Sequence, residues 1–65
     1  MNIILNGKPA EIAGGTLAAT VTELGYGEKR IATAVNGRFV PIREREALQL
    51  GEGDRVEILT PRHGG

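Results

Sequence analysis

The chain has 65 residues, with eight Lys or Arg against eight Asp or Glu and no formal net charge at neutral pH. A chain this short forms one domain and buries only about 60% of the surface that its unfolded form exposes. Balanced charge without a long run of either sign argues against nucleic acid and anionic membranes as partners. The absence of cysteine favours a reducing cytoplasm, and a single histidine argues against a metal site or a histidine-based triad.

The N-terminal segment, residues 1–6, has no basic flank and breaks at an Asn-Gly pair, so we expect neither a signal peptide nor a membrane span there. Asn-Gly is favoured in tight turns where both central residues need positive φ. The pair at 6–7 therefore predicts a hairpin between residues 3–5 and 8–12. Pro9 cannot donate a backbone hydrogen bond, which predicts that the second of these strands lies at a sheet edge.

A short helix is expected next, after the Gly-Gly pair at 14–15. Thr16 can cap it, and Leu17, Val21 and Leu24 recur at i, i+4 and i+7, which places them on one face. Gly25 supplies a stop. The residues inside are poor helix formers, so packing against a sheet must hold this helix.

A second Asn-Gly pair, at 36–37, predicts a hairpin between residues 31–35 and 38–42, with Pro41 again indicating an edge strand. Which face residues 31–35 turn inward is left open, because Ala32 and Ala34 suit either environment. The alternating charges of residues 43–46 predict a solvated surface segment.

A last strand, residues 56–59, follows a turn-like stretch over 50–54. The order hairpin, helix, hairpin, strand predicts an α+β fold: a mixed sheet of about five strands with one helix packed across one face. A strand near each end of the chain would lie between the hairpins, so the first and last strands would be parallel neighbours. This is the order of a β-grasp, ubiquitin-like fold.

Alternation along the first and last strands predicts that Val56, Ile58 and Ile3 face the helix, whereas Ile4 and Leu59 face the opposite side of the sheet. That side has nothing from a one-helix chain to cover it. We interpret Ile4 and Leu59 as a docking patch, against the alternative of two scattered surface aliphatics.

The domain is expected over residues 1–59, and residues 60–65 are expected to form a flexible tail ending in Gly64 and Gly65. Terminal glycines lack side chains, so a narrow active site of another protein can close on their backbone. The Gly65 carboxylate is the predicted reactive group. Its carbon is a poor electrophile while ionised, so it needs activation by a partner enzyme. Arg62 and His63 are expected to contact that enzyme's channel.

Three stretches resemble the ThiS family of sulfur carriers of thiamine biosynthesis, small ubiquitin-like proteins. Residues 34–41 (AVNGRFVP) are similar to the family's second hairpin, residues 52–58 (EGDRVEI) to its entry into the last strand, and Gly64-Gly65 to its terminal diglycine. The chain departs from the family at Ile42, where members often carry arginine.

The resemblance implies a carrier that is not itself an enzyme and binds no cofactor. A ThiF-type adenylating enzyme would use ATP to activate Gly65, a sulfur-delivering protein would convert it to a thiocarboxylate, and a ThiG-type thiazole synthase would take the sulfur. Two alternatives stay open: a sulfur carrier for molybdopterin or cysteine synthesis, and a ubiquitin-like protein modifier. The oligomeric state is not predicted.

Overall fold

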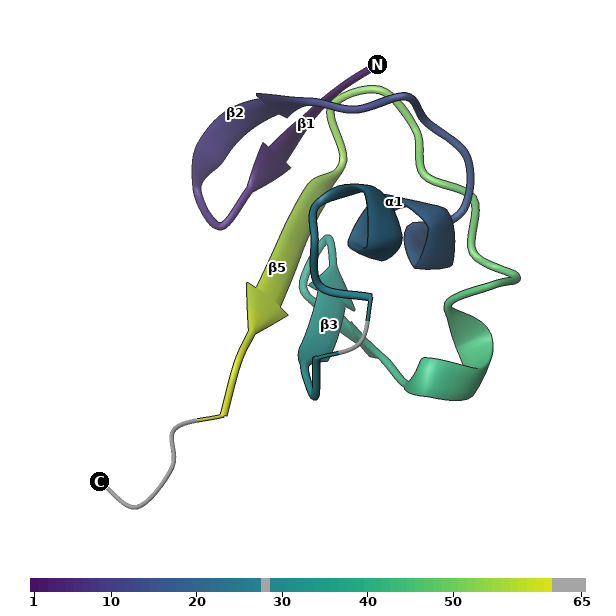
Figure 1. Ribbon diagram of the computed structural model, residues 1–65. Helices are drawn as coiled ribbons and strands as arrows, with labels where there is room; N and C mark the ends of the chain where they lie inside the picture. Colours follow the sequence, from purple (N-terminus) through teal and green to yellow (C-terminus); the bar gives the residue numbers. More distant parts are fainter. Residues whose placement is uncertain (28, 62–65) are drawn as a thin grey trace.

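The structure is a computed structural model, and it describes residues 1–27 and 29–61. These residues form five strands, one α-helix and one short 3₁₀-helix, and the strands and the α-helix follow the predicted order (Figure 1). In chain order the elements are β1 (Asn2–Leu5), β2 (Lys8–Glu11), α1 (Leu17–Glu23), β3 (Ala32–Val35), β4 (Arg38–Val40), η1 (Ile42–Glu44) and β5 (Arg55–Leu59).

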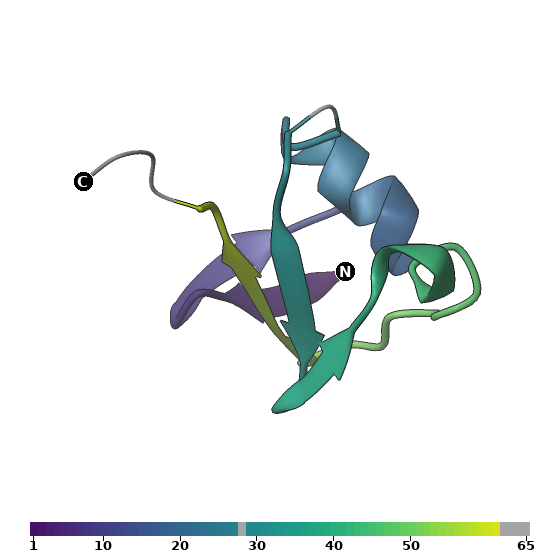
Figure 2. The same cartoon turned by 90° about the horizontal axis from the view of Figure 1, so that it is seen from below.

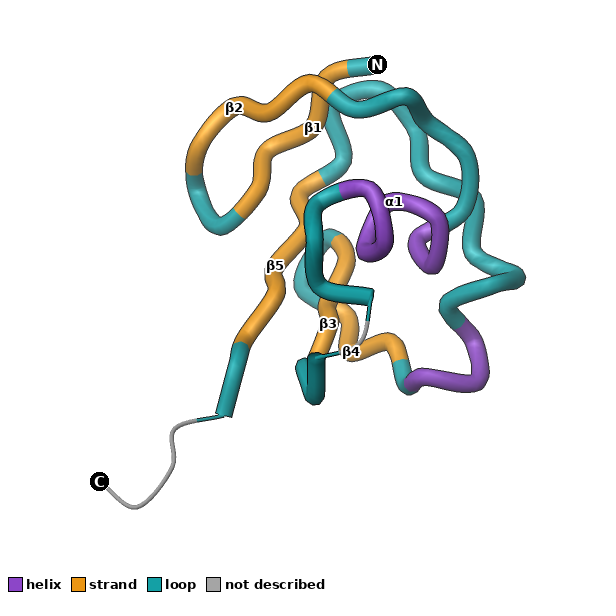
Figure 3. Tube along the Cα trace, in the orientation of Figure 1, coloured by secondary structure: helices purple, strands orange, loops and turns teal. Residues whose placement is uncertain are grey.

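The five strands form one mixed sheet in the order β2-β1-β5-β3-β4. β1 and β5 are parallel, with Ile4 opposite Arg55, and the other neighbouring pairs are antiparallel. The prediction that the first and last strands are parallel neighbours is therefore confirmed. Figure 2 shows α1 and the segment that carries η1 on one side of the sheet, and Figure 3 shows the same path with all five strands in one colour. The fold is a ubiquitin-like β-grasp.

Both hairpins turn on their Asn-Gly pairs. Asn6 and Gly7 have φ of 50° and 84°, and Asn36 and Gly37 have φ of 51° and 83°. Positive φ at both central residues is the signature of a type I′ turn, whose twist matches that of the flanking strands. The edge positions are also confirmed, because β2, which contains Pro9, and β4, which Pro41 follows, are the outer strands.

Helix α1 has seven residues, and its start is held by three separate hydrogen bonds. The Thr16 hydroxyl accepts from the Ala19 amide at 3.1 Å, as predicted for its cap. The amide of Leu17 donates to the Leu48 carbonyl at 2.8 Å, and that of Ala18 donates to the Arg45 carbonyl at 3.0 Å. The first-turn amides of a helix have no partner within the helix, so these bonds satisfy them and anchor a segment of weak helix formers.

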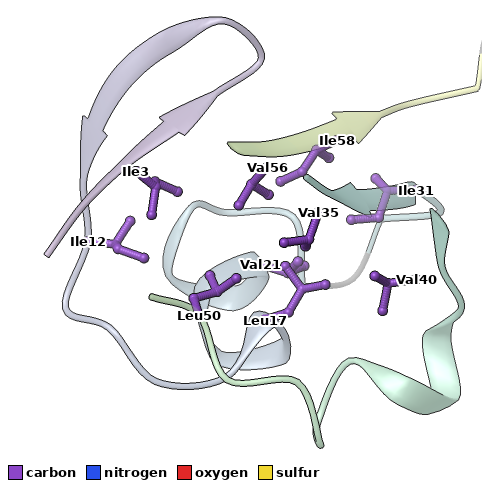
Figure 4. Close-up of a cluster of buried hydrophobic side chains, with 10 residues drawn as sticks. All are labelled: Ile3, Ile12, Leu17, Val21, Ile31, Val35, Val40, Leu50, Val56 and Ile58. Atoms are coloured by element: carbon purple, nitrogen blue, oxygen red, sulfur yellow. The ribbon is translucent and has the colours of Figure 1, made fainter. Parts of the chain in front are cut away.

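The core lies between α1 and the sheet, and its buried apolar side chains are all aliphatic (Figure 4). Pairing with β5 decides the face of β3: Thr33 and Val35 lie opposite the buried Ile58 and Val56, whereas Ala32 and Ala34 lie on the other face. The inward face of β5 is thus as predicted. The buried cluster consists of Ile3, Ile12, Leu17, Val21, Ile31, Val35, Val40, Leu50, Val56 and Ile58.

Of two predictions for the segment after the second hairpin, one was wrong and the other is confirmed except at one residue. The strand predicted over 38–42 ends at Val40, and Ile42 begins η1. Pro41 has no amide proton with which to extend the ladder, and its carbonyl instead accepts from the Glu44 amide at 2.9 Å, which closes the 3₁₀ turn.

The run 43–46 is exposed as predicted except at Arg45, which is half-buried. Its Nε donates to the Thr33 hydroxyl at 3.0 Å and its Nη2 donates to the Ile31 carbonyl at 2.9 Å. The Thr33 hydroxyl in turn donates to the Val40 carbonyl at 2.7 Å. Arg45 therefore ties the end of η1 to β3, a role that the alternating charges did not indicate.

Candidate functional site

The predicted reactive tail continues directly from β5, the central strand of the sheet. β5 is flanked by β1 and β3, so it is supported along both edges. The strand ends at Leu59, and the exposed Thr60 and Pro61 lead away from it. The other tail residues for which a role is predicted lie outside the described residues: Arg62, His63, Gly64 and Gly65.

The start of β5 is held by a polar network centred on Asp54. Its Oδ2 accepts from the Gly51 amide at 2.7 Å, and its Oδ1 accepts from Asn36 Nδ2 at 3.0 Å. These hydrogen bonds, that from Gly51 foremost, lower the pKa of the Asp54 carboxyl below its ordinary value. The carboxylate is therefore ionised at neutral pH, where it fixes the 51–54 turn that leads into β5.

An apolar surface lies on the open face of the sheet beside the end of β5. Leu59 is 67% exposed and lies opposite Ala32, while Phe39 is 65% exposed and lies opposite Ala34. The two large side chains thus border the small ones of β3 on one face, and the exposed Glu57 of β5 borders the set opposite Ala34. We call this set the open-face patch: Ala32, Ala34, Phe39 and Leu59.

The structure places the two residues of the predicted docking pair on one face of the sheet but not side by side. Ile4 and Leu59 both lie on the open face, but the register places Ile4 beside Arg55, four residues along β5 from Leu59. At about 3.3 Å per residue this separates them by roughly 13 Å, and Glu57 lies between them on that face. Ile4 instead borders a hollow of about 320 Å³ between the two hairpin turns, where Gly7 and Gly37 present no side chains.

A larger groove, of about 590 Å³, lies near the start of β5, away from the tail, between the second hairpin and residues 44–49. Its charged lining includes Asp54, already committed to the turn, and Arg38. Because Asp54 precedes the first residue of β5 and the tail follows the last, the groove lies at the wrong end of the strand to contact the tail root. Among the described residues no cluster of three or more His, Cys, Asp or Glu could hold a metal ion. None of the described helices is long and apolar enough to cross a bilayer.

Two features of this region escaped sequence reasoning. Phe39 was not recognised as a surface residue, although its alternation with the buried Val40 contained the signal. Asn6 and Asn36 were interpreted as turn residues alone, yet both side chains contact β5. No local sequence pattern predicts these side-chain contacts, because the partner strand is far away in the sequence.

In a comparison with known protein families, residues 3–65 of the chain match the ThiS family. The chain belongs to the ThiS family. The match spans β1 to the diglycine, so it covers the domain and the tail together.

Two solved structures agree with this membership. The crystal structure of the thiamine biosynthesis protein ThiS from Geobacter metallireducens is 26% identical, has a TM-score of 0.84 and covers all of both chains. The solution structure of a thiamine biosynthesis protein from the same organism is also 26% identical, with a TM-score of 0.81, covering 100% of this chain and 88% of that one. No curated protein sequence matches the chain.

Proposed function

We propose that this ThiS-family chain is a sulfur carrier in thiamine biosynthesis and that the carboxylate of Gly65 carries the sulfur. The observation that carries the proposal is the family match, which runs through the domain and includes the diglycine. In this cycle the chain is a cosubstrate, and its partner enzymes perform the catalysis.

Three partners act in sequence in the proposed cycle. A ThiF-type enzyme transfers AMP from ATP to the Gly65 carboxylate and releases pyrophosphate, which makes the carbonyl carbon electrophilic. A persulfide on a sulfur-delivering protein displaces AMP, and a thiol then reduces the acyl disulfide to leave the thiocarboxylate. A ThiG-type synthase takes this sulfur into the thiazole ring. The need for ATP assigns the cycle to the cytoplasm.

The fold supports this role through the position of β5. When another protein binds the tail in its active site, any pulling force on the tail acts on the strand that precedes it. β5 is paired on both sides, whereas the edge strands β2 and β4 are each paired on one. Like β1 and β3, the tail-bearing strand can therefore separate from the sheet only if two ladders break together, whereas an edge strand needs only one to break.

The open-face patch is the proposed contact surface for the activating enzyme. Its two large side chains are exposed, Glu57 borders it, and Leu59 immediately precedes the tail root, so a partner that binds the tail meets this surface next. Buried aromatic anchors carry much of the free energy of association at interfaces, which singles out Phe39.

The patch is tested by comparing Phe39→Ala with Ile42→Ala. Ile42 is 71% exposed but borders a hollow beside α1, on the opposite side of the sheet. We expect Phe39→Ala to raise the carrier concentration that half-saturates the activating enzyme about tenfold, and Ile42→Ala to leave it unchanged. Equal effects of the two substitutions would place the contact elsewhere.

Mass spectrometry tests the proposed chemistry. Incubation with the activating enzyme, ATP and a sulfur source should yield a species in which one C-terminal oxygen is replaced by sulfur. The same incubation without ATP, or of a chain that lacks Gly65, should yield none. If no such species forms and loss of Gly65 leaves thiamine synthesis intact, the proposal is wrong. A deletion strain that needs the thiazole moiety would support thiamine; loss of molybdoenzyme activity, or high-mass conjugates, would support the alternatives.

A further inference from the structure

On the side facing β1, strand β5 has one more hydrogen-bonded residue than the backbone of β1 can pair with. The Ile4 amide donates to the Asp54 carbonyl and the Asn6 amide donates to the Val56 carbonyl, each at 2.9 Å. Alternate residues of β5 face β1, so Ile58 is the next in line. The backbone of the first hairpin has by then turned away at Gly7.

The side chain of Asn6 forms the hydrogen bonds with Ile58 that the backbone of β1 does not form. Its Oδ1 accepts from the Ile58 amide at 2.9 Å, and its Nδ2 donates to the Ile58 carbonyl at 3.2 Å. A primary amide carries one acceptor oxygen and two donor protons, so it can imitate the carbonyl and amide of a strand residue. The side chain of Asn6 thus stands where a further residue of β1 would.

Ile58 is consequently the last residue of β5 that is bonded toward β1. Leu59 faces β3, where Ala32 lies opposite it. Thr60 would face β1 again, and there the Asn6 side chain has already ended the ladder. The position of one amide therefore coincides with the point at which the chain leaves the sheet.

We propose that Asn6 is a positioning residue that fixes where the tail leaves the domain, a role that rests on the proposed carrier function. We call the two hydrogen bonds between the Asn6 side chain and Ile58 an amide clamp. With this clamp in place, residues 59–65 extend at most about 25 Å beyond Ile58. Without it the end of β5 frays, and the activating enzyme must order more chain to seat the carboxylate, which costs conformational entropy.

The second hairpin provides a matched control. Asn36 has the same turn geometry as Asn6, and its Oδ1 accepts from the Arg55 amide at 3.0 Å. That contact is made to the first residue of β5, whereas the contact of Asn6 is made close to the last. Substituting either asparagine removes an amide clamp on β5, but only one of the two clamps lies next to the tail.

The test compares Asn6→Gly with Asn36→Gly, since glycine tolerates the positive φ of both turns. Native-state hydrogen exchange should speed up about tenfold at the Ile58 amide in Asn6→Gly and stay unchanged there in Asn36→Gly. Asn6→Asp, which keeps the acceptor and loses the donor, should give an intermediate increase. With the activating enzyme, Asn6→Gly should raise the half-saturating carrier concentration about fivefold while the maximal rate is kept; Asn36→Gly should change neither.

Two outcomes would overturn the role of Asn6: unchanged exchange at Ile58 in Asn6→Gly, or equal half-saturation for the two glycine variants. Failure of the unsubstituted chain to be activated at all would instead overturn the carrier function on which the role rests. The exchange measurement requires no partner enzyme, so the two failures are distinguishable.

Discussion

Two buried threonines provide a test in which the same substitution has opposite effects. Thr20, in α1, is 0% exposed, and its hydroxyl has no hydrogen-bond partner among the described residues. Thr33, in β3, is 1% exposed, and its hydroxyl donates to the Val40 carbonyl and accepts from Arg45 Nε. Valine matches the shape of threonine and lacks only the hydroxyl.

Burying an unpaired hydroxyl costs about 1–3 kcal/mol, and threonine and valine have similar helix propensity. Thr20→Val should therefore raise the free energy of unfolding by about 1 kcal/mol, which corresponds to about 4–8 °C in Tm for a domain of this size. Thr33→Val removes two hydrogen bonds and leaves the Val40 carbonyl and Arg45 Nε each short of a partner. It should lower the free energy of unfolding by about 1–3 kcal/mol.

Urea unfolding followed by circular dichroism measures both changes, and an unchanged m-value would show that only stability moved. A midpoint that falls in Thr20→Val would refute the assignment of its hydroxyl as unpaired. Shifts of the same sign in both variants would refute the broader reasoning that hydrogen-bond partners, and not burial alone, decide what a buried hydroxyl costs.

Three further predictions concern the turns and the tie between η1 and β3. The folded-state pKa of Asp54 lies below its ordinary value of 3.8. The stability that the Asp54 carboxylate contributes should therefore be complete above pH 3.8 and lost as the pH falls through the lowered pKa. The urea midpoint of Asp54→Asn should accordingly fall less with acidification than that of the unsubstituted chain. Arg45→Met should lower the free energy of unfolding by about 1–2 kcal/mol, because the hydrogen bonds to Thr33 and Ile31 are lost. Thermal melting measures this change, and an unchanged Tm would contradict the role of Arg45 in linking η1 to β3. Gly37→Ala, at φ +83°, should cost about 1 kcal/mol through backbone strain, whereas Gly51→Ala should be nearly neutral; equal urea midpoints would exclude strain as the cause.

The sequence predicts most of this fold because its local signals agree with one another. Each Asn-Gly pair lies between apolar runs, and Thr16 precedes a helical repeat of apolar residues, so every turn and cap supports the same order of elements. That order leaves only one natural place for the last strand, between the hairpins, which is where β5 lies.

The failures arise where a distant partner decides the outcome. Ala32 and Ala34 are small enough for either face, and only pairing with β5 places them outward. Arg45 reads as a surface charge until Thr33 and the Ile31 carbonyl are brought beside it. The outward position of Phe39 was implied by alternation, but its place on the same face as Leu59, across β3, depends on the register.

The asparagines show why a turn signal can carry more information than a turn. Glycine would satisfy the positive φ at Asn6 as well as asparagine does, so backbone geometry alone does not demand the side chain. The two contacts of its amide with Ile58 give asparagine an advantage that glycine lacks. The choice of residue in a turn at one end of the chain thereby influences the strand at the other end, from which the tail departs. In the proposed carrier role, the first hairpin sets the point from which the last residues extend.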